Sequence, residues 1–226
     1  MRHMCGRFER SSSVEILIRD FRLNRTSIEI EPSYNIAPSQ DVLIIRLDEE
    51  EKRQLESCRW GFLPSWAKDP AMAHKIINAR AETVATKPAS RCAFKRQRCL
   101  VLADGFYEWQ KQEHGKVPFY IHLKSGRPFG LAGLYSHWTP EKAAESICTC
   151  TIITTDANEL LEPIHDRMPV IIPRDSEDRW LDPRSEDQER LLALLKPYPS
   201  DEMALHAVSL KVNSPGFNSP DAIKSI

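Results

Sequence analysis

The chain has 226 residues, and its 31 Lys and Arg side chains nearly balance 32 Asp and Glu, which gives a formal net charge of −1. This balance excludes a globally basic nucleic-acid-binding protein but leaves room for a local basic groove. A hydrophobic content of 41%, with no apolar run near the roughly 18 residues of a membrane span and no signal-peptide pattern, predicts a folded cytoplasmic protein without a membrane partner.

The predicted elements begin with a short amphipathic helix over residues 14–21, which the serines at 11–13 can cap. Strands are predicted at 42–47 and 55–60, joined by a charged turn. His114-Gly115 marks a later hairpin turn, and two helices are expected at 176–181 and 186–196. The other predicted strands cover residues 99–102, 106–110, 117–123, 129–135, 147–154 and 170–172.

Many strands in succession, flanked by a few helices, indicate an α+β fold with a mainly antiparallel, barrel-like β-sheet core. A doubly wound α/β fold is disfavoured because strands and helices do not alternate and no Gly-rich phosphate loop is present. We find no repeat, low-complexity tract or linker, so we expect residues 1–226 to form a single domain. A monomer is the default expectation.

Six cysteines lie at positions 5, 58, 92, 99, 148 and 150. None forms a Cys-x-x-Cys pair and no nearby histidine completes a zinc template, so we expect no metal and no cofactor. A chain of this length does not need a disulfide framework, which favours a reduced protein. Cys148 and Cys150 alternate with threonines and are expected on one face of a strand, as small apolar side chains.

Six short segments combine polar, aromatic and glycine residues in a way that a core does not require; they cover residues 5–8, 34–38, 60–66, 78–82, 104–109 and 165–169. With these segments in this order, the chain resembles the SOS-response-associated peptidase (SRAP) family over essentially its whole length. The resemblance implies the SRAP fold and a protein that senses abasic sites in single-stranded DNA. It also implies cysteine-type autopeptidase and DNA lyase activities.

Cys5, followed by Gly-Arg-Phe, matches the amino-terminal cysteine of that family. A terminal cysteine carries an amine of pKa about 7.7–8.0 beside a thiol of pKa about 8.5. The amine can condense with the open-chain aldehyde of an abasic sugar, and the thiol can then close a thiazolidine ring. Arg7 is a nearby cation that can favour the thiolate and contact DNA.

Residues 1–4 precede Cys5, and we expect their removal to expose its amine. One alternative is that Met4 is the natural start and that cloning added the residues before it. The other is a native leader that the chain cuts between Met4 and Cys5 or that an aminopeptidase removes. In either case Cys5 is predicted to react only as the terminal residue.

The resemblance assigns the remaining site residues. Glu108, among aromatic residues, is predicted to have a raised pKa and to act as a general acid and base. Asn78 and Arg80 lie two apart on an extended segment, so both can engage one ligand, with Arg80 on a phosphate. The resemblance implies that His165 assists sugar ring opening and crosslink reversal, and that Thr154 lines the same DNA-binding pocket.

Aromatic and basic residues outside these positions predict further contacts with DNA. Trp66, Phe62 and Pro38 suit stacking on bases, a sequence-tolerant interaction, although core packing is the competing interpretation. A basic cluster is predicted to edge the DNA groove, with a solvated helix face as the alternative; it comprises Arg91, Lys95, Arg96 and Arg98.

The leading hypothesis is therefore a nucleoid-associated protein that forms a covalent DNA–protein crosslink through Cys5. The first alternative is an N-terminal-nucleophile cysteine hydrolase or peptidase, in which Cys5 attacks an amide and its own amine is the base. The second is a non-covalent single-stranded DNA-binding module. That module would bind intact and abasic strands equally and would tolerate Glu108→Gln.

Overall fold

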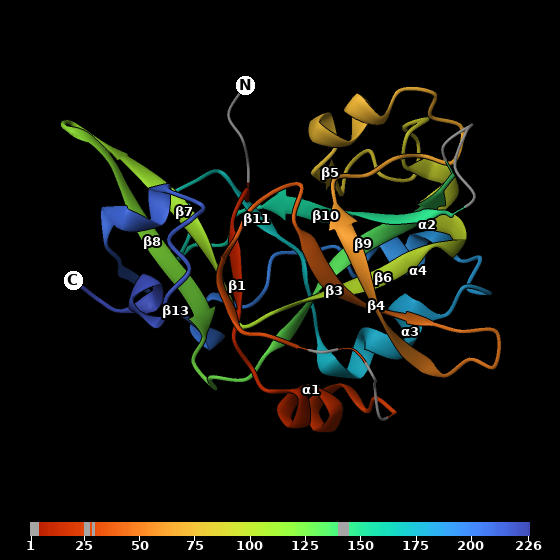
Figure 1. Ribbon diagram of the computed structural model, residues 1–226, viewed down its shortest axis with the longest axis horizontal. Helices are drawn as coiled ribbons and strands as arrows, with labels where there is room; N and C mark the ends of the chain where they lie inside the picture. The colour runs from red at the N-terminus through yellow and green to blue at the C-terminus, as the bar shows by residue number, and fades with distance from the viewer. Residues whose placement is uncertain (1–4, 25–27, 29, 140–144) are drawn as a thin grey trace.

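The computed structural model describes residues 5–24, 28, 30–139 and 145–226, so the leader expected at residues 1–4 lies outside the described part. Within that part, most strands belong to two sheets, with short helices around the larger one (Figure 1). The predicted α+β class with mainly antiparallel sheets is confirmed. None of the described helices is long and apolar enough to cross a membrane.

The larger sheet closes on itself. Its strands follow the order β11-β10-β4-β3-β6-β9-β12, and β9 also pairs with β10, which completes the ring and agrees with the predicted barrel-like core. Neighbours are antiparallel except β10 with β4, which are parallel, as are β10 and the short β5. The strands are β3 (Asp41–Leu47), β4 (Arg53–Trp60), β5 (Asn78–Arg80), β6 (Arg98–Ala103), β9 (Phe129–Trp138), β10 (Ile147–Asp156), β11 (Arg167–Pro169) and β12 (Ile171–Ile172).

Alternation along these strands builds two hydrophobic cores. Ile45 and Ile153 face a core shared with the helices, whereas Ile44 and Ile152 face a second core shared with the smaller sheet. All four side chains are fully buried. The helices that cover the first core are α1 (Val14–Phe21), α2 (Arg91–Arg96), α3 (Glu177–Leu181) and α4 (Gln188–Leu192).

The smaller sheet has the order β13-β8-β7-β1-β2 and is antiparallel throughout. Its central β7–β8 hairpin turns through Glu113 and His114 into Gly115, whose φ of +139° suits glycine, so the predicted turn is confirmed. The strands are β1 (Phe8–Arg10), β2 (Ser33–Ile36), β7 (Gly105–Gln112), β8 (Gly115–Leu123) and β13 (Met203–Ala207).

Several predicted elements differ in their ends. The predicted helix at 14–21 matches α1, which begins after Ser13, whose hydroxyl accepts the amide of Ile16. The helix expected at 186–196 is the shorter α4, and Pro197 disfavours helical geometry at the residue before it. The strand expected at 170–172 is the shorter β12, because Val170 instead bonds Ile153 and Ala132, and β11 just before it was not predicted.

The cysteines depart from the expected reduced state at one pair. Cys58 on β4 and Cys148 on β10 form a disulfide, so that expectation is wrong for these two residues. Their Cα atoms are 4.7 Å apart, within the range of about 4.4–6.8 Å that a disulfide requires. Only the pairing of two distant strands creates this proximity, which explains why sequence spacing did not reveal it. Cys148 and Cys150 do share a face of β10, as predicted.

Candidate active site

Cys5 lies just before β1, where β1 pairs with β7 of the smaller sheet. The amide of Tyr107 donates to the carbonyl of Arg7 at 3.0 Å, which fixes the two chains side by side. As a result, the backbone nitrogen of Cys5 donates to Glu108 Oε1 at 2.8 Å. Cys5 is 1% exposed and has a φ of +31°, an unusual conformation for a residue with a side chain.

Glu108 is buried on β7, and its environment favours the neutral acid. Burial is the main cause that raises its pKa to about 8, and the hydrogen bonds from the Cys5 and Trp109 amides only partly oppose it. A carboxyl group of this pKa can both donate and accept a proton near neutral pH. Burial, and secondarily the charge of Glu108, also raise the pKa of the Cys5 thiol.

Asn78 approaches Cys5 from the larger sheet. It begins β5, which pairs in parallel with β10, and its Nδ2 donates to the Cys5 carbonyl at 3.3 Å. Arg80, two residues on, is exposed and lies opposite Thr154 of β10. Thr154 itself is fully buried, so its side chain does not reach the surface. The two sheets therefore meet at Cys5.

His165 follows β10 in the loop that leads to β11. Its Nδ1 accepts the backbone amide of Arg167 at 3.1 Å and also lies 3.0 Å from Asp166 Oδ1. A backbone amide can only donate, so the contact with Arg167 uses the lone pair of Nδ1 and leaves Nε2 to carry the ring hydrogen.

Arg167 holds this loop in place. Its guanidinium donates to Glu82 Oε1 at 2.6 Å, to Asp156 Oδ1 at 2.7 Å and to the Thr154 carbonyl at 2.7 Å. Asp166, its neighbour in sequence, contacts His165 instead. The role of Arg167 is to fix where His165 sits.

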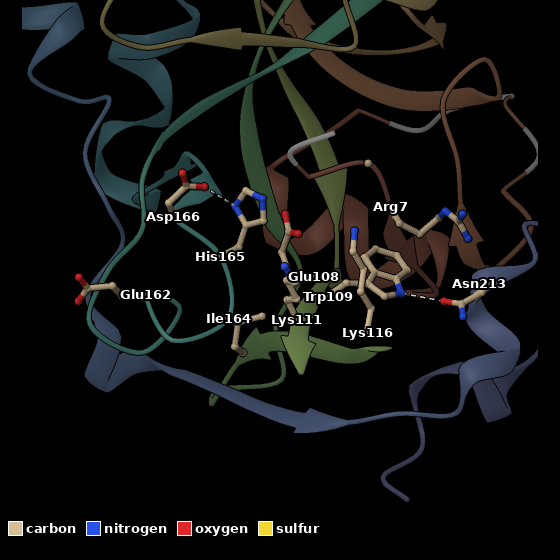
Figure 2. Close-up of a pocket in the computed structure, with 11 residues that line it drawn as sticks. Arg7, Glu108, Trp109, Lys111, Lys116, Glu162, Ile164, His165, Asp166 and Asn213 are labelled. Carbon is tan, nitrogen blue, oxygen red and sulfur yellow. Dashed lines mark hydrogen bonds and ion pairs between the residues drawn. The ribbon is translucent and has the colours of Figure 1, made fainter. Parts of the chain in front are cut away.

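A pocket of about 910 Å³ opens at this junction (Figure 2). It brings together three residues predicted from the sequence: Arg7, Glu108 and His165. Asn78 reaches the same place through its bond to Cys5, whereas Arg80, Thr154, Trp66 and Pro38 do not line the pocket. The other lining residues are Gly6, Trp109, Lys111, Lys116, Glu162, Ile164, Asp166 and Asn213.

Arg7 is anchored within the pocket wall. One nitrogen, Nη1, donates to Asn35 Oδ1 and to the Val212 carbonyl, each at 2.7 Å. The guanidinium also lies 5.8 Å from the centre of the Trp109 ring, whose Nε1 donates to Asn213. These contacts orient Arg7 while leaving it half-buried in the pocket.

Sequence reasoning missed two cations of the pocket. Lys111 and Lys116 are partners across the β7–β8 hairpin, and both line the pocket. The predicted strands stop at residue 110 and resume at residue 117, so neither lysine was assigned to a strand. The signal available in the sequence was that both lysines flank the predicted hairpin turn, close to Glu108.

Two other predicted DNA contacts are wrong because the side chains are buried. Phe62 is 1% exposed in the helix-covered core and cannot stack on a base, whereas Trp66 is 55% exposed. Arg98 is 2% exposed, and its guanidinium donates to the carbonyls of Trp180 and Phe94 at 2.8 and 2.7 Å. Arg98 thus ties α2 and α3 to the sheet and does not edge a DNA groove.

Metal-binding capacity lies elsewhere in the described part of the chain. One group of three side chains there could hold an ion, namely Glu56, Cys58 and Cys148. None of them lines the pocket beside Cys5.

Comparison with known proteins gives a consistent family. Residues 4–215 match the family model described as SOS response associated peptidase (SRAP). The abasic site processing protein YoqW of Bacillus subtilis is 46% identical over 98% of this chain and 100% of its own length. The abasic site processing protein YedK of Escherichia coli is 30% identical over 93% of this chain and 95% of its own.

A longer relative and a solved structure are also similar to this chain. The abasic site processing protein HMCES of Xenopus tropicalis is 34% identical, over 88% of this chain and 68% of its own length. A crystal structure of a protein from Bacteroides thetaiotaomicron superimposes with a TM-score of 0.83 at 27% identity, covering 97% of this chain and 99% of that one.

Proposed function

The chain belongs to the SOS response associated peptidase (SRAP) family, and from this membership and the geometry around Cys5 we propose that it processes abasic sites in single-stranded DNA by covalent capture. The observation that carries the proposal is the 2.8 Å contact between the Cys5 nitrogen and Glu108 Oε1. Once the preceding residues are removed, this nitrogen becomes a terminal amine beside a buried carboxyl group able to move protons near neutral pH.

The reaction begins at the aldehyde carbon of the open sugar. The Cys5 amine adds to it, and one proton passes from nitrogen to the new hydroxyl oxygen. That hydroxyl takes a proton from Glu108 and leaves as water, and the nitrogen then returns its remaining proton to Glu108, which gives an imine. The Cys5 sulfur then bonds to the same carbon while its proton passes to the nitrogen, which closes the thiazolidine. Overall, one water is lost for each crosslink.

The amide nitrogen of an internal cysteine cannot take part in this chemistry. Hydrolysis of the Met4–Cys5 bond adds one water and yields the free amine. Cys5 is both the residue exposed by that cleavage and a thiol available as the nucleophile for it. Autoproteolytic or aminopeptidase removal of the leader is therefore part of the proposal.

Strand cleavage is a side reaction of the same imine. An imine acidifies the proton on the adjacent sugar carbon, and loss of that proton expels the 3′ phosphate. His165, with Nδ1 occupied by a backbone amide, has Nε2 left to exchange protons with the sugar. Ring closure by sulfur removes the imine, so crosslinking competes with lyase activity.

The cationic and aromatic surroundings suit a DNA strand. Arg7, Lys111 and Lys116 supply positive charge at the pocket, and exposed Arg80 and Trp66 can contact phosphate and base. A local footprint of this kind is compatible with the net charge of −1. Because DNA is the proposed substrate, we propose that the protein associates with the nucleoid.

The test is a denaturing gel with single-stranded oligonucleotides that carry either one abasic site or none. Protein whose terminus is confirmed by mass as Cys5 is compared with Cys5→Ala and with protein that retains residues before Cys5. We expect a heat-stable shifted band only for terminal Cys5 on the abasic strand. Equal binding of both strands without a covalent band would support the simple binding module, and peptide cleavage without a band would support a hydrolase.

A further inference from the structure

Three neighbouring strands place two cysteines, a glutamate and a histidine together, away from the Cys5 pocket. Cys58 on β4 lies beside Cys148 on β10, one step from the Thr149–Arg59 pair of the parallel ladder. Glu56 lies two residues before Cys58, on the same face of β4. His137 on β9 is the direct partner of Cys148. No member of this cluster lines the Cys5 pocket.

The donor atoms of this cluster converge. The ligand atoms of Glu56, Cys58 and Cys148 all lie within 4.8 Å of one another. His137 Nε2 lies 2.7 Å from Glu56 Oε1, which adds a fourth donor. The sequence alone gives no hint of this set, because positions 56, 58, 137 and 148 match no local zinc spacing.

We propose that this cluster binds a divalent cation of the zinc class when the Cys58–Cys148 disulfide is reduced. Two sulfurs, one imidazole nitrogen and one carboxylate oxygen form a four-donor set typical of tetrahedral zinc. Metal–ligand bonds of about 2.0–2.3 Å place such donors about 3.3–3.8 Å apart. Three of the donors already lie within a span that encloses this geometry.

The local charge also fits a divalent cation. The Arg46 guanidinium and His137 Nε2 both donate to the carboxylate of Glu56. Two thiolates and this carboxylate carry three negative charges. A divalent cation and the Arg46 guanidinium together balance them. Without a cation, two thiolates side by side would repel each other.

The same two sulfurs cannot form a disulfide and hold a cation. A low-molecular-weight thiol supplies two electrons and two protons, which breaks the S–S bond and leaves two Cys thiols with a disulfide of the reductant. The cation then displaces the two thiol protons to solvent as its bonds to sulfur form, and the hydrogen on His137 Nε2 moves to Nδ1 so that Nε2 can bind the cation. Binding is therefore controlled by the redox state of this pair.

The other cysteines of this core do not extend the site. Cys99 and Cys150 are fully buried, and neither belongs to the group of converging donor atoms. Cys148 is only partly buried and His137 is exposed, which gives an ion a route to the cluster from solvent. Cys92 is exposed on α2 and belongs to neither group, so it provides a matched control.

The experiment is a Co²⁺ titration of the full chain, reduced with a phosphine, in the Cys5→Ala background to remove the other reactive cysteine. We expect thiolate-to-cobalt charge-transfer absorption and the visible bands of a tetrahedral ion, both displaced by Zn²⁺. Cys58→Ala/Cys148→Ala should weaken binding by more than about 100-fold, since even outer-shell partners of metal ligands are worth about 10–100-fold. His137→Ala should weaken it less, and Cys92→Ala should not change it.

The oxidised form of the same protein is a control that does not depend on how a variant folds. Thiol counting should find two fewer accessible thiols after oxidation, and cobalt absorption should disappear. The proposal is overturned if the folded, phosphine-treated protein retains the disulfide or gives no thiolate–cobalt band. It is also overturned if Cys58→Ala/Cys148→Ala, folded by circular dichroism, binds within threefold of its parent.

Discussion

The two sheets differ in how their strands are specified and in what they contribute to the site. The closed sheet consists mainly of long strands that bury both faces, and it supplies Asn78 and the loop of His165 (Figure 1). The smaller sheet supplies Glu108 and holds Cys5 through the three-residue β1. The proposed chemistry therefore depends on a short strand in the second.

The largest effect is expected at Glu108 in the smaller sheet. Glu108→Gln keeps an acceptor for the Cys5 nitrogen but cannot move a proton, so the crosslinking rate should fall by about 10²–10⁴-fold. Single-turnover gels with abasic oligonucleotide measure this rate. Glu113→Gln, at the hairpin turn, is the matched control. An unchanged crosslinking rate in Glu108→Gln would show that the carboxyl group transfers no proton in the reaction.

Two aromatic residues of one segment sharpen the contrast between core and DNA surface. Phe62→Ala should lower the free energy of unfolding by about 3–5 kcal/mol, because it leaves a cavity in the helix-covered core. Trp66→Ala should leave stability unchanged and weaken single-stranded DNA binding by about 1–3 kcal/mol. Urea denaturation and fluorescence anisotropy measure the two quantities. Equal stability losses in both variants would contradict this division.

The raised pKa of Glu108 predicts a pH-dependent stability. The folded state holds a proton up to about pH 8, whereas the unfolded chain releases it near pH 4.5, so stability should fall as pH rises between these values. Each pKa unit corresponds to about 1.4 kcal/mol. The wild type should therefore lose about 2–4 kcal/mol more unfolding free energy than Glu108→Gln when the pH rises from 5 to 9. Melting curves at the two pH values would refute this if the two proteins lost stability in parallel.

Two arginines close in sequence provide the smallest effect. Arg98→Ala removes a buried guanidinium from backbone carbonyls of α2 and α3 and should cost about 1–3 kcal/mol of stability. Arg96→Ala, on the exposed end of α2, should cost almost nothing. DNA affinity should not fall in Arg98→Ala when the protein is folded. A loss of DNA affinity in folded Arg98→Ala, without the same loss in Arg96→Ala, would instead support a contact between Arg98 and DNA.

Local patterns in the sequence were sufficient to predict the long strands and α1. The strands predicted at 42–47 and 129–135 correspond to β3 and β9, because alternation over many residues is a strong signal. No comparable pattern marks β1 or β5, which are three residues long and form by pairing with distant strands. These short strands are the ones that position Cys5 and Asn78.

The site residues were also predictable in part: their chemistry can be identified from the sequence, but their burial and their contacts across strands cannot. Residue chemistry and the family resemblance pointed to Cys5, Glu108 and His165, which the fold brings to one junction. Burial was the information that the sequence lacked, and Arg98 was misplaced for that reason. The Cys58–Cys148 contact was missed because it depends on the register of β4 and β10.

The central claim is most directly tested by the intact mass of the product formed with an abasic oligonucleotide, without any borohydride reductant. The account predicts a stable adduct whose mass is that of protein beginning at Cys5 plus DNA minus one water, with fragmentation placing the modification on Cys5. An adduct on a lysine, or one that persists only after borohydride reduction, would contradict it.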